Sequence, residues 1–445
     1  MNNDTPTAHH LAPAASVSDQ MRADWNRRAR EDANYYVAFG SRDQDEEGFL
    51  ATGQEVVGTI EWELKRLPKN PNRRGWRALE IGCGPGRLMK PLSRHFGEIH
   101  GVDVSDEMIG LARERLRGIP HAHVHLGAGA GLPQFADDSF EIVYTYAVYQ
   151  HIPSRDVVLE YMRETRRVLK PGGIFRGQFN GLPPHPDLNT WIGVSFSADE
   201  IRAFTREQGL QLLALESTGT QYMWTTWRKP VPLPAAAHAA SPTLRRITNA
   251  LTAEPLVPVS GRLACIALWI VNLPPESDLN TIDVRVDGRS GVLTFVGPQE
   301  ADNLQQVNVV LPDSTRTGLV PVEIFVNGSR LCPPAVARVI PAGPLVPRIA
   351  SVSDGINLIE ENRSTTGSLK VQIEEVLHPE LITATVADRP VRNLEYMLTD
   401  PVPYRYDVNF LLPEGLQPGR YSLQLKIGNR ALLPREIEVA PKIAS

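Results

Sequence analysis

An apolar segment that runs directly into a glycine-rich turn, ALEIGCGPGRL at residues 78 to 88, constrains this sequence more than any other feature. Gly82, Gly84 and Gly86 permit backbone conformations that other residues rarely adopt, and they let the chain approach a ligand where a Cβ would clash. A helix after the turn would offer free N–H groups and the positive end of its dipole to an anionic group. The segment therefore predicts a strand, a ligand-binding turn and then a helix near 86–96.

Two common nucleotide-binding motifs do not fit this turn. The dinucleotide fingerprint G-x-G-x-x-G requires a small residue at position 87, where this chain has Arg87. A Lys-Ser/Thr pair of the phosphate-binding loop type is also missing. The turn alone is a weak signal, so its meaning depends on the motifs that lie further along the chain.

Short apolar runs alternate with helical patterns from Trp76 to about Trp227, which is typical of βαβ units and a mostly parallel sheet. We expect strands near 77–81, 98–103, 122–127, 140–147, 173–180, 210–217 and 221–227. We expect helices near 86–96, 106–117, 155–169 and 198–208, the last starting at the capping box Ser197 to Glu200. Two amphipathic helices are expected between 19 and 67, after a disordered tail over 1–18.

The residue pattern changes after a Pro- and Ala-rich segment at 231–243, which we expect to be a linker. Alternating Val, Ile and Leu with frequent Gly and Pro then predict an all-β region. This region is repeated with an offset of 101 residues, because QVNVVLP from Gln306 matches DVNFLLP from Asp407 and Gly318 matches Gly419. We expect two β-sandwiches, over 244–345 and 346–445, that resemble the immunoglobulin-like modules of the TIG/IPT type.

The segment 78–86 resembles the first motif of class I S-adenosylmethionine-dependent methyltransferases of the small-molecule and cell-envelope group. GVDVSDEMI at 101–109, LPQFADDSFEIVYTYAVYQHIP at 132–153 and LKPGG at 169–173 come next in the family's order and spacing. The resemblance implies a Rossmann-like sheet with helices on both faces over 19–230, and S-adenosylmethionine as the cofactor. It implies cofactor-binding roles for Glu80, Gly82, Cys83, Gly84, Gly86, Asp103, Val104, Met108, Ala128, Gly129, Thr145 and Tyr146.

Two of these positions carry specific roles. Asp103 stands where the family has an acid that accepts hydrogen bonds from the ribose hydroxyls, and Val104 and Met108 would flank the adenine. The family often has Gly-Asp after the third strand, but this chain has Gly127-Ala128. The missing carboxylate would weaken cofactor binding by about 1 kcal/mol without forbidding it, since the backbone of Ala128 and Gly129 could still contact the adenine.

Methyl transfer from a sulfonium is an in-line displacement that needs few catalytic side chains. An oxygen acceptor benefits from a base, and His151 after the fourth strand is the best placed candidate; a role in ordering the turn is an equal alternative. Trp25 is expected to pack helix against sheet. One of Tyr35 and Tyr36 is expected to face the pocket, and Phe39 belongs to the same possible lid. Asn180 and His185 lie in a long segment where the family binds its acceptor.

The net charge of −5 and the absence of a long basic run argue against nucleic acid as a partner. No stretch approaches the length of a membrane span, no metal-ligand spacing occurs, and we expect a cytoplasmic location with Cys265 and Cys332 reduced.

The expected function is O-methylation of a small molecule, sugar or cell-envelope glycan. The alternatives are a cofactor-binding protein without catalysis and a protein methyltransferase whose sandwiches dock a partner. We expect the sandwiches to be a separable binding or spacing arm, which could also join two chains into a homodimer.

Overall fold

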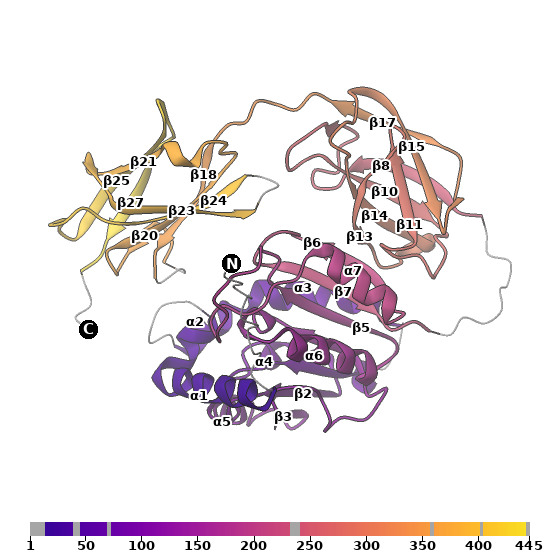
Figure 1. The fold of residues 1–445 in the computed structure, drawn as a ribbon, viewed down its shortest axis with the longest axis horizontal. Coiled ribbons are helices and arrows are strands. Elements are labelled where there is room, and N and C mark those ends of the chain that lie inside the picture. The colour runs from indigo at the N-terminus through magenta and orange to yellow at the C-terminus, as the bar shows by residue number, and fades with distance from the viewer. Residues whose placement is uncertain are drawn as a thin grey trace, which may run out of the picture.

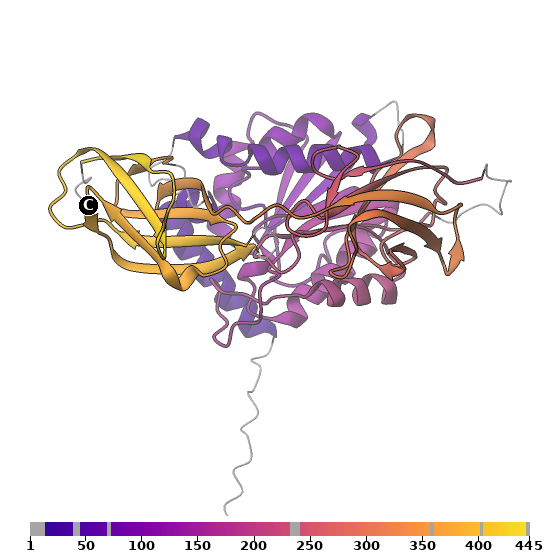
Figure 2. The same cartoon turned by 90° about the horizontal axis from the view of Figure 1, so that it is seen from above.

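The computed structural model describes residues 14–38, 45–68, 73–231, 241–356, 360–400 and 404–441. Three bodies succeed one another along the chain: an α/β body and two strand-rich bodies, which lie at opposite ends of the molecule in both views (Figures 1 and 2). The mixed α/β class and the strand-rich second half agree with the expectations from the sequence.

Three α-helices precede the sheet, where two were expected. They are α1 (Ala14–Ala38), α2 (Glu46–Ala51) and α3 (Gln54–Glu63). Helix α1 starts before the expected Asp19, and Val17 and Ser18 are buried, so the expected tail was too long. The first thirteen residues of the chain lie outside the described residues, as does Phe39.

Seven strands form the sheet of the α/β body, and each matches an expected strand. They are β1 (Arg77–Ile81), β2 (Glu98–Asp103), β3 (Ala122–Leu126), β4 (Phe140–Thr145), β5 (Leu169–Phe179), β6 (Gln211–Glu216) and β7 (Met223–Arg228). Their order is β3-β2-β1-β4-β5-β7-β6. The first five are parallel and β7 runs antiparallel between β5 and β6.

Four helices connect these strands: α4 (Met89–Leu92), α5 (Asp106–Arg115), α6 (Arg155–Val168) and α7 (Ala198–Glu207). Both hydrogen bonds of the capping box between Ser197 and Glu200 are present at the start of α7. Each of α5, α6 and α7 begins directly after a serine whose side chain accepts a backbone N–H, which explains where these helices start.

Two expectations were wrong in detail. The helix expected over 86–96 is reduced to the single turn α4 and a 3₁₀ turn at Ser93–His95, with Pro91 inside α4. A helix this short has only a small dipole to offer an anionic group at its start. The segment LKPGG belongs to β5 itself rather than to a preceding turn; the strand accommodates Gly172 at a φ of +83° through an irregular register opposite Phe140.

Each half of the described C-terminal region packs two sheets face to face, and it contains strands and short 3₁₀ turns only. The first half has β8 (Thr243–Asn249), β9 (Val257–Pro258), β10 (Cys265–Val271), β11 (Ile282–Val286), β12 (Arg289–Ser290), β13 (Val292–Val296), β14 (Leu304–Val310), β15 (Gly318–Val326), β16 (Ser329–Arg330) and β17 (Ala335–Ile340). The second half has β18 (Arg348–Asp354), β19 (Arg363–Ser364), β20 (Ser368–Glu374), β21 (Ile382–Val386), β22 (Arg389–Pro390), β23 (Arg392–Asp400), β24 (Arg405–Leu411), β25 (Gly419–Ile427), β26 (Arg430–Ala431) and β27 (Arg435–Val439). Strands β24 and β25 begin 101 residues after β14 and β15, so the sequence repeat is also a repeat of strands.

The first strand-rich body continues the sheet of the α/β body. Strand β13 pairs antiparallel with β6 through Phe295 and Ala214, which joins β13, β14, β10 and β8 into one sheet of eleven strands (Figure 1). Arg202 of α7 donates to the carbonyls of Leu279 and Leu293 at 2.8 and 2.7 Å. Both bodies share one cluster of buried apolar residues, so the first sandwich is not the separable arm that we expected.

The second sandwich has a buried core of its own and is attached more loosely. An ion pair between Arg262 and Glu374, with a nitrogen to oxygen distance of 3.8 Å, links it to the first sandwich. Residues 232–240 of the linker expected at 231–243 lie outside the described residues. No helix in the described ranges is long and apolar enough to cross a membrane.

Candidate cofactor and acceptor site

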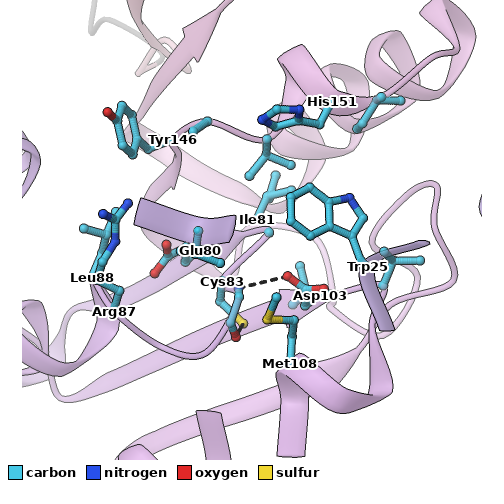
Figure 3. A pocket seen from close by; sticks show the side chains of 18 of the residues that line it. Trp25, Glu80, Ile81, Cys83, Arg87, Leu88, Asp103, Met108, Tyr146 and His151 are labelled. Atoms are coloured by element: carbon cyan, nitrogen blue, oxygen red, sulfur yellow. Dashed lines mark hydrogen bonds between the residues drawn. The ribbon is translucent and has the colours of Figure 1, made fainter. Parts of the chain in front are cut away.

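A cavity opens at the carboxyl ends of β1, β2 and β4, beneath helix α1 (Figure 3). The space between its walls, counted together with open solvent at its mouth, measures about 900 Å³. Its walls are formed by Met21, Trp25, Tyr36, Val37, Glu80, Ile81, Gly82, Cys83, Gly84, Arg87, Leu88, Val102, Asp103, Val104, Met108, Tyr146, Ala147, Val148, His151, Ile152 and Tyr161. Ligands of open parallel sheets bind at this edge.

The three glycines of the turn have different roles. All three adopt positive φ angles, of 69°, 49° and 82° at Gly82, Gly84 and Gly86. A Cβ on Gly82 would meet Val148 at 2.3 Å, while one on Gly86 would press against Leu116 at 3.3 Å, just after α5. Gly82 and Gly84 line the cavity, but Gly86 does not, so Gly86 allows close packing of the turn on α5.

Asp103 at the end of β2 is held in place by the backbone. Its two carboxylate oxygens accept hydrogen bonds from the N–H groups of Gly84 and Ser105, each at 2.9 Å. Burial raises the pKa of Asp103, and these backbone donors lower it in return. Each oxygen keeps a lone pair for a further donor, which suits recognition of a pair of hydroxyl groups.

Glu80, the last but one residue of β1, is a buried acid at the centre of the cavity floor (Figure 3). It is 3% exposed, and the hydroxyl of Tyr144 donates to it at 3.0 Å. Burial raises the pKa of Glu80 to about 8, although the hydrogen bond from Tyr144 and the charge of Arg87 act in the opposite direction. The carboxyl group is therefore mostly protonated at neutral pH.

His151 lies on the 3₁₀ turn Tyr149–His151 that comes after β4. Its Nδ1 is 2.9 Å from the carbonyl oxygen of Trp191, so Nδ1 carries the proton and Nε2 holds the lone pair. Burial lowers the pKa of His151 to about 4, against the opposing effect of this hydrogen bond, and the ring is neutral at pH 7. The side-chain nitrogen of Gln150 lies 3.3 Å from Nε2, and Gln178 in turn donates to Gln150.

Helix α1 and the segment after β5 cover the cavity. Trp25 packs against the apolar core, as expected; it also lines the cavity and meets the ring of His151 edge-on at 5.6 Å between centroids. Arg28 donates to the backbone and hydroxyl oxygens of Thr190, each at 3.0 Å, which ties α1 to that segment. Tyr36 lines the cavity, whereas Tyr35 packs edge-on against Tyr36 at 5.2 Å.

Several predicted site residues lie outside the cavity wall. Asn180 accepts a hydrogen bond from the N–H of Leu182, and His185 is exposed and bonds within its own turn at Asp187. Thr145 is buried and donates to the carbonyl of Ile81. Ala128 and Gly129 are likewise absent from the wall, because Ser18 of α1 packs against Gly129.

Arg87 is a site residue that was not predicted from the sequence. It lines the cavity at the end opposite Asp103 and is 5% exposed. In the sequence it stood out only as a departure from the dinucleotide fingerprint. The signal available in the sequence was a basic residue directly after a glycine-rich turn that was expected to bind a ligand.

Residues 79–176 match the family described as a methyltransferase domain. The chain carries a methyltransferase domain over these residues.

Two named relatives each match about a quarter of this chain. The ubiquinone biosynthesis O-methyltransferase of Sinorhizobium fredii is 33% identical over 113 residues, which is 25% of this chain and 44% of that protein. The demethylmenaquinone methyltransferase of Staphylococcus aureus is 33% identical over 116 residues, 25% of this chain and 46% of that protein. The chain thus spans less than half the length of either relative.

A solved structure also resembles the chain. It is the phosphoethanolamine N-methyltransferase 1 of Haemonchus contortus in complex with phosphoethanolamine and S-adenosylhomocysteine, with 16% identity and a TM-score of 0.39. The match covers 53% of each chain.

Proposed function

We propose that the protein transfers a methyl group from S-adenosylmethionine to an oxygen atom of a small molecule, a sugar or a cell-envelope glycan. The observation that carries the proposal is that Asp103 and His151 face one cavity from opposite walls. The first is arranged to hold a ribose, and the second is a neutral imidazole beside the remaining space. The name of the ubiquinone relative supports an oxygen acceptor.

The residues of the cavity fit this cofactor. Asp103 keeps lone pairs for two hydroxyl donors, and the apolar side chains of Val104 and Met108 stand beside it for the adenine. When bound, the cofactor supplies an activated methyl group on a positively charged sulfur. The protein must then hold the acceptor in line with that group and keep water away.

His151 acts in the proposal as the base that takes the proton from the acceptor hydroxyl at Nε2. Its neutral state at pH 7 leaves the lone pair available, while the bond from Nδ1 to the carbonyl of Trp191 fixes the ring and its tautomer. The edge contact with Trp25 closes the space around the ring against solvent. Gln150 is the competing partner at Nε2, and its long contact of 3.3 Å is one that an acceptor hydroxyl can replace.

The test has two steps. Purified protein is first titrated with S-adenosylhomocysteine by calorimetry, and a panel of phenols, hydroxy acids, sugars and thiols is then offered with labelled S-adenosylmethionine. Methylation at a hydroxyl that falls strongly in His151→Ala, with cofactor affinity kept, supports the proposal. Cofactor binding with turnover only on thiols or amines would contradict the choice of oxygen, and a lack of turnover on every class would favour a binding protein without catalysis.

A further inference from the structure

A second cavity, which we call the junction cavity, lies between the methyltransferase domain and the first sandwich. One side is formed by the 3₁₀ turn Leu64–Arg66, by Gln211 at the start of β6 and by Arg228 at the end of β7; the other is formed by residues 275–277 and 296–299 of the sandwich. The space between its walls, counted together with open solvent, measures about 1520 Å³. Among the described residues it has no lining residue in common with the first cavity, so a ligand bound here would occupy a separate site.

Two cations of the junction cavity, Lys65 and Arg228, have no ion-pair partner within the described part of the chain. Arg228 Nη2 donates to the carbonyl oxygen of Arg66 at 2.9 Å, and Lys65 Nζ lies 5.4 Å from the ring centroid of Trp62. Burial lowers the pKa of Arg228 to about 10, and the charge of Arg66 acts in the same direction. Glu276 is the one carboxylate among the described lining residues, and it is exposed. The cavity therefore has an excess of positive charge.

Two further polar groups of the cavity wall are buried without a hydrogen-bond partner. Arg66 is 5% exposed; its Nε donates to Glu63 and its Nη1 to the carbonyl oxygen of Val296, but Nη2 has no partner among the described residues. Ser277 is 4% exposed, and its hydroxyl also lacks a partner there. Buried polar groups are nearly always hydrogen-bonded, so these two donors indicate a ligand with several acceptor oxygens.

Contacts between the domain and the sandwich hold the two sides of the junction cavity in register. Gln211 lies opposite Arg228 in the antiparallel pair of β6 and β7, so both side chains are on the same face of the sheet. Gln211 Nε2 donates to the carbonyl oxygen of Pro275 at 2.9 Å, which fixes the segment that includes Ser277. The cations of the domain and the hydroxyl of the sandwich are thus part of one ordered site.

We propose that the junction cavity is a second ligand site, which binds a phosphate group through the charges of Arg228 and Lys65. Arg66 Nη2 and the hydroxyl of Ser277 are further donors to the phosphate oxygens. A phosphate monoester carries a charge of about −1.5 to −2 at pH 7 and has three strong acceptor oxygens, which matches two unpaired cations and several donors better than a single carboxylate does. Because the ligand contacts both bodies, it stabilises the attachment of the first sandwich to the domain.

The experiment titrates the full chain with inorganic phosphate at constant ionic strength, by calorimetry and by thermal unfolding. Phosphate should bind saturably and raise the melting temperature, because it binds the folded protein and not the unfolded chain. The titration is repeated with saturating S-adenosylhomocysteine, which should leave the phosphate affinity within about twofold because the two sites are separate. Acetate is the carboxylate comparison and should bind at least about tenfold more weakly.

Glycerol 3-phosphate separates the two sources of a phosphate group. Binding as tight as or tighter than that of inorganic phosphate supports a phosphorylated small molecule as the ligand. Binding of inorganic phosphate alone supports the same site with the free ion as its ligand.

Substitutions connect the binding to the proposed residues. Arg228→Met should weaken inorganic phosphate by about tenfold to a hundredfold, and Lys65→Gln by about threefold to tenfold because its side chain is exposed. Arg245→Met removes a cation from an exposed position on β8, so it is the matched control and should leave the affinity unchanged. Without phosphate, Arg228→Met should melt no lower than the wild type, because it removes a largely buried charge that has no counter-charge.

Four results would overturn the proposal. The wild type could show no saturable binding of phosphate, or Arg228→Met and Lys65→Gln could both bind it as tightly as the wild type. Competition between phosphate and S-adenosylhomocysteine would assign the anion to the first cavity, and acetate binding as tight as phosphate would exclude the choice of phosphate. If Arg228→Met fails to fold, Lys65→Gln decides the test, since an exposed side chain can be replaced without loss of the fold.

Discussion

The burial of Glu80 leads to a prediction about the stability of the ligand-free protein. Testing this prediction requires no knowledge of the acceptor. Its pKa rises from the usual 4.5 to about 8 on folding, mainly through burial. The folded protein therefore binds more protons than the unfolded chain between these two pH values, so stability must fall as pH rises through this window. The contribution is complete below about pH 4.5 and levels off above pH 8.

The magnitude comes from the two pKa values. With 1.36 kcal/mol per pKa unit, the stability lost through Glu80, relative to a pH at which it is protonated in both the folded and the unfolded state, is about 1 kcal/mol at pH 5.5 and about 4 kcal/mol at pH 7.5. The wild type should thus lose about 2 to 3 kcal/mol of stability between these two pH values through this residue alone. Glu80→Gln keeps an acceptor for Tyr144 and cannot ionise, so it lacks this loss.

The assay is urea denaturation of both proteins, freed of bound nucleotide, at pH 5.5 and 7.5. Other groups also make stability depend on pH between 5.5 and 7.5. One is His151, whose pKa is about 4 in the folded protein but has its usual value of 6.5 in the unfolded chain. Their effects cancel in the difference between variant and wild type, which should widen by about 2 to 3 kcal/mol from the lower to the higher pH. A difference that stays constant would refute the reasoning that burial raises the pKa of Glu80.

Three further predictions concern the cofactor, the base and the shared sheet. Asp103→Ala should weaken S-adenosylhomocysteine by about tenfold to a hundredfold in calorimetry, with Glu114→Ala on the exposed face of α5 as the unaffected control, and equal affinities would contradict the ribose assignment. His151→Ala should lower turnover by about 10² to 10⁴ while S-adenosylhomocysteine still binds; joint loss of both would make it a structural residue. A fragment that ends at residue 240 should be insoluble or melt well below the full chain, because removal of the first sandwich exposes β6 and half of the shared core. A soluble fragment with full cofactor affinity would show that the methyltransferase domain does not need β13.

The strand and turn that hold the cofactor motif could be predicted because local geometry determines them. A glycine-rich turn after β1 and an acid at the end of β2 are brought together by any parallel pairing of these two neighbouring strands. Gly84 and Asp103 accordingly lie within hydrogen-bond distance, at 2.9 Å. The wall formed by α1 was harder to predict, because amphipathic spacing tells which face of a helix is buried and not what that face meets. Trp25 could therefore be predicted to pack against the sheet, and it is partly buried there, but its contact with His151 could not be foreseen.

The position of Ala128 and Gly129 outside the cavity wall has the same origin. Ala128 and Gly129 come after β3 where the family's pattern has its adenine contact, but the early start of α1 brings Ser18 onto Gly129. The composition of residues 1–18 predicted a tail, because it reflects only the weak local preference of these residues for a helix. Burial of Val17 and contacts of Arg22 with the carbonyls of Val104 and Gly127 stabilise the helix instead.

The two halves of the sequence repeat are equivalent in strands and unequal in role. The alternation of apolar residues predicts which face of a strand is buried, but it does not predict which other strand pairs with that strand. Strand β6 would be an open edge of the methyltransferase sheet, and the pairing of Ala214 with Phe295 closes it with the first sandwich. The corresponding sheet of the second sandwich ends at β23, where Tyr396, Met397 and Leu398 remain exposed. The first sandwich shares its apolar core with the methyltransferase domain, whereas the second sandwich has a separate core. We therefore expect that a partner, if one docks, binds to the second sandwich.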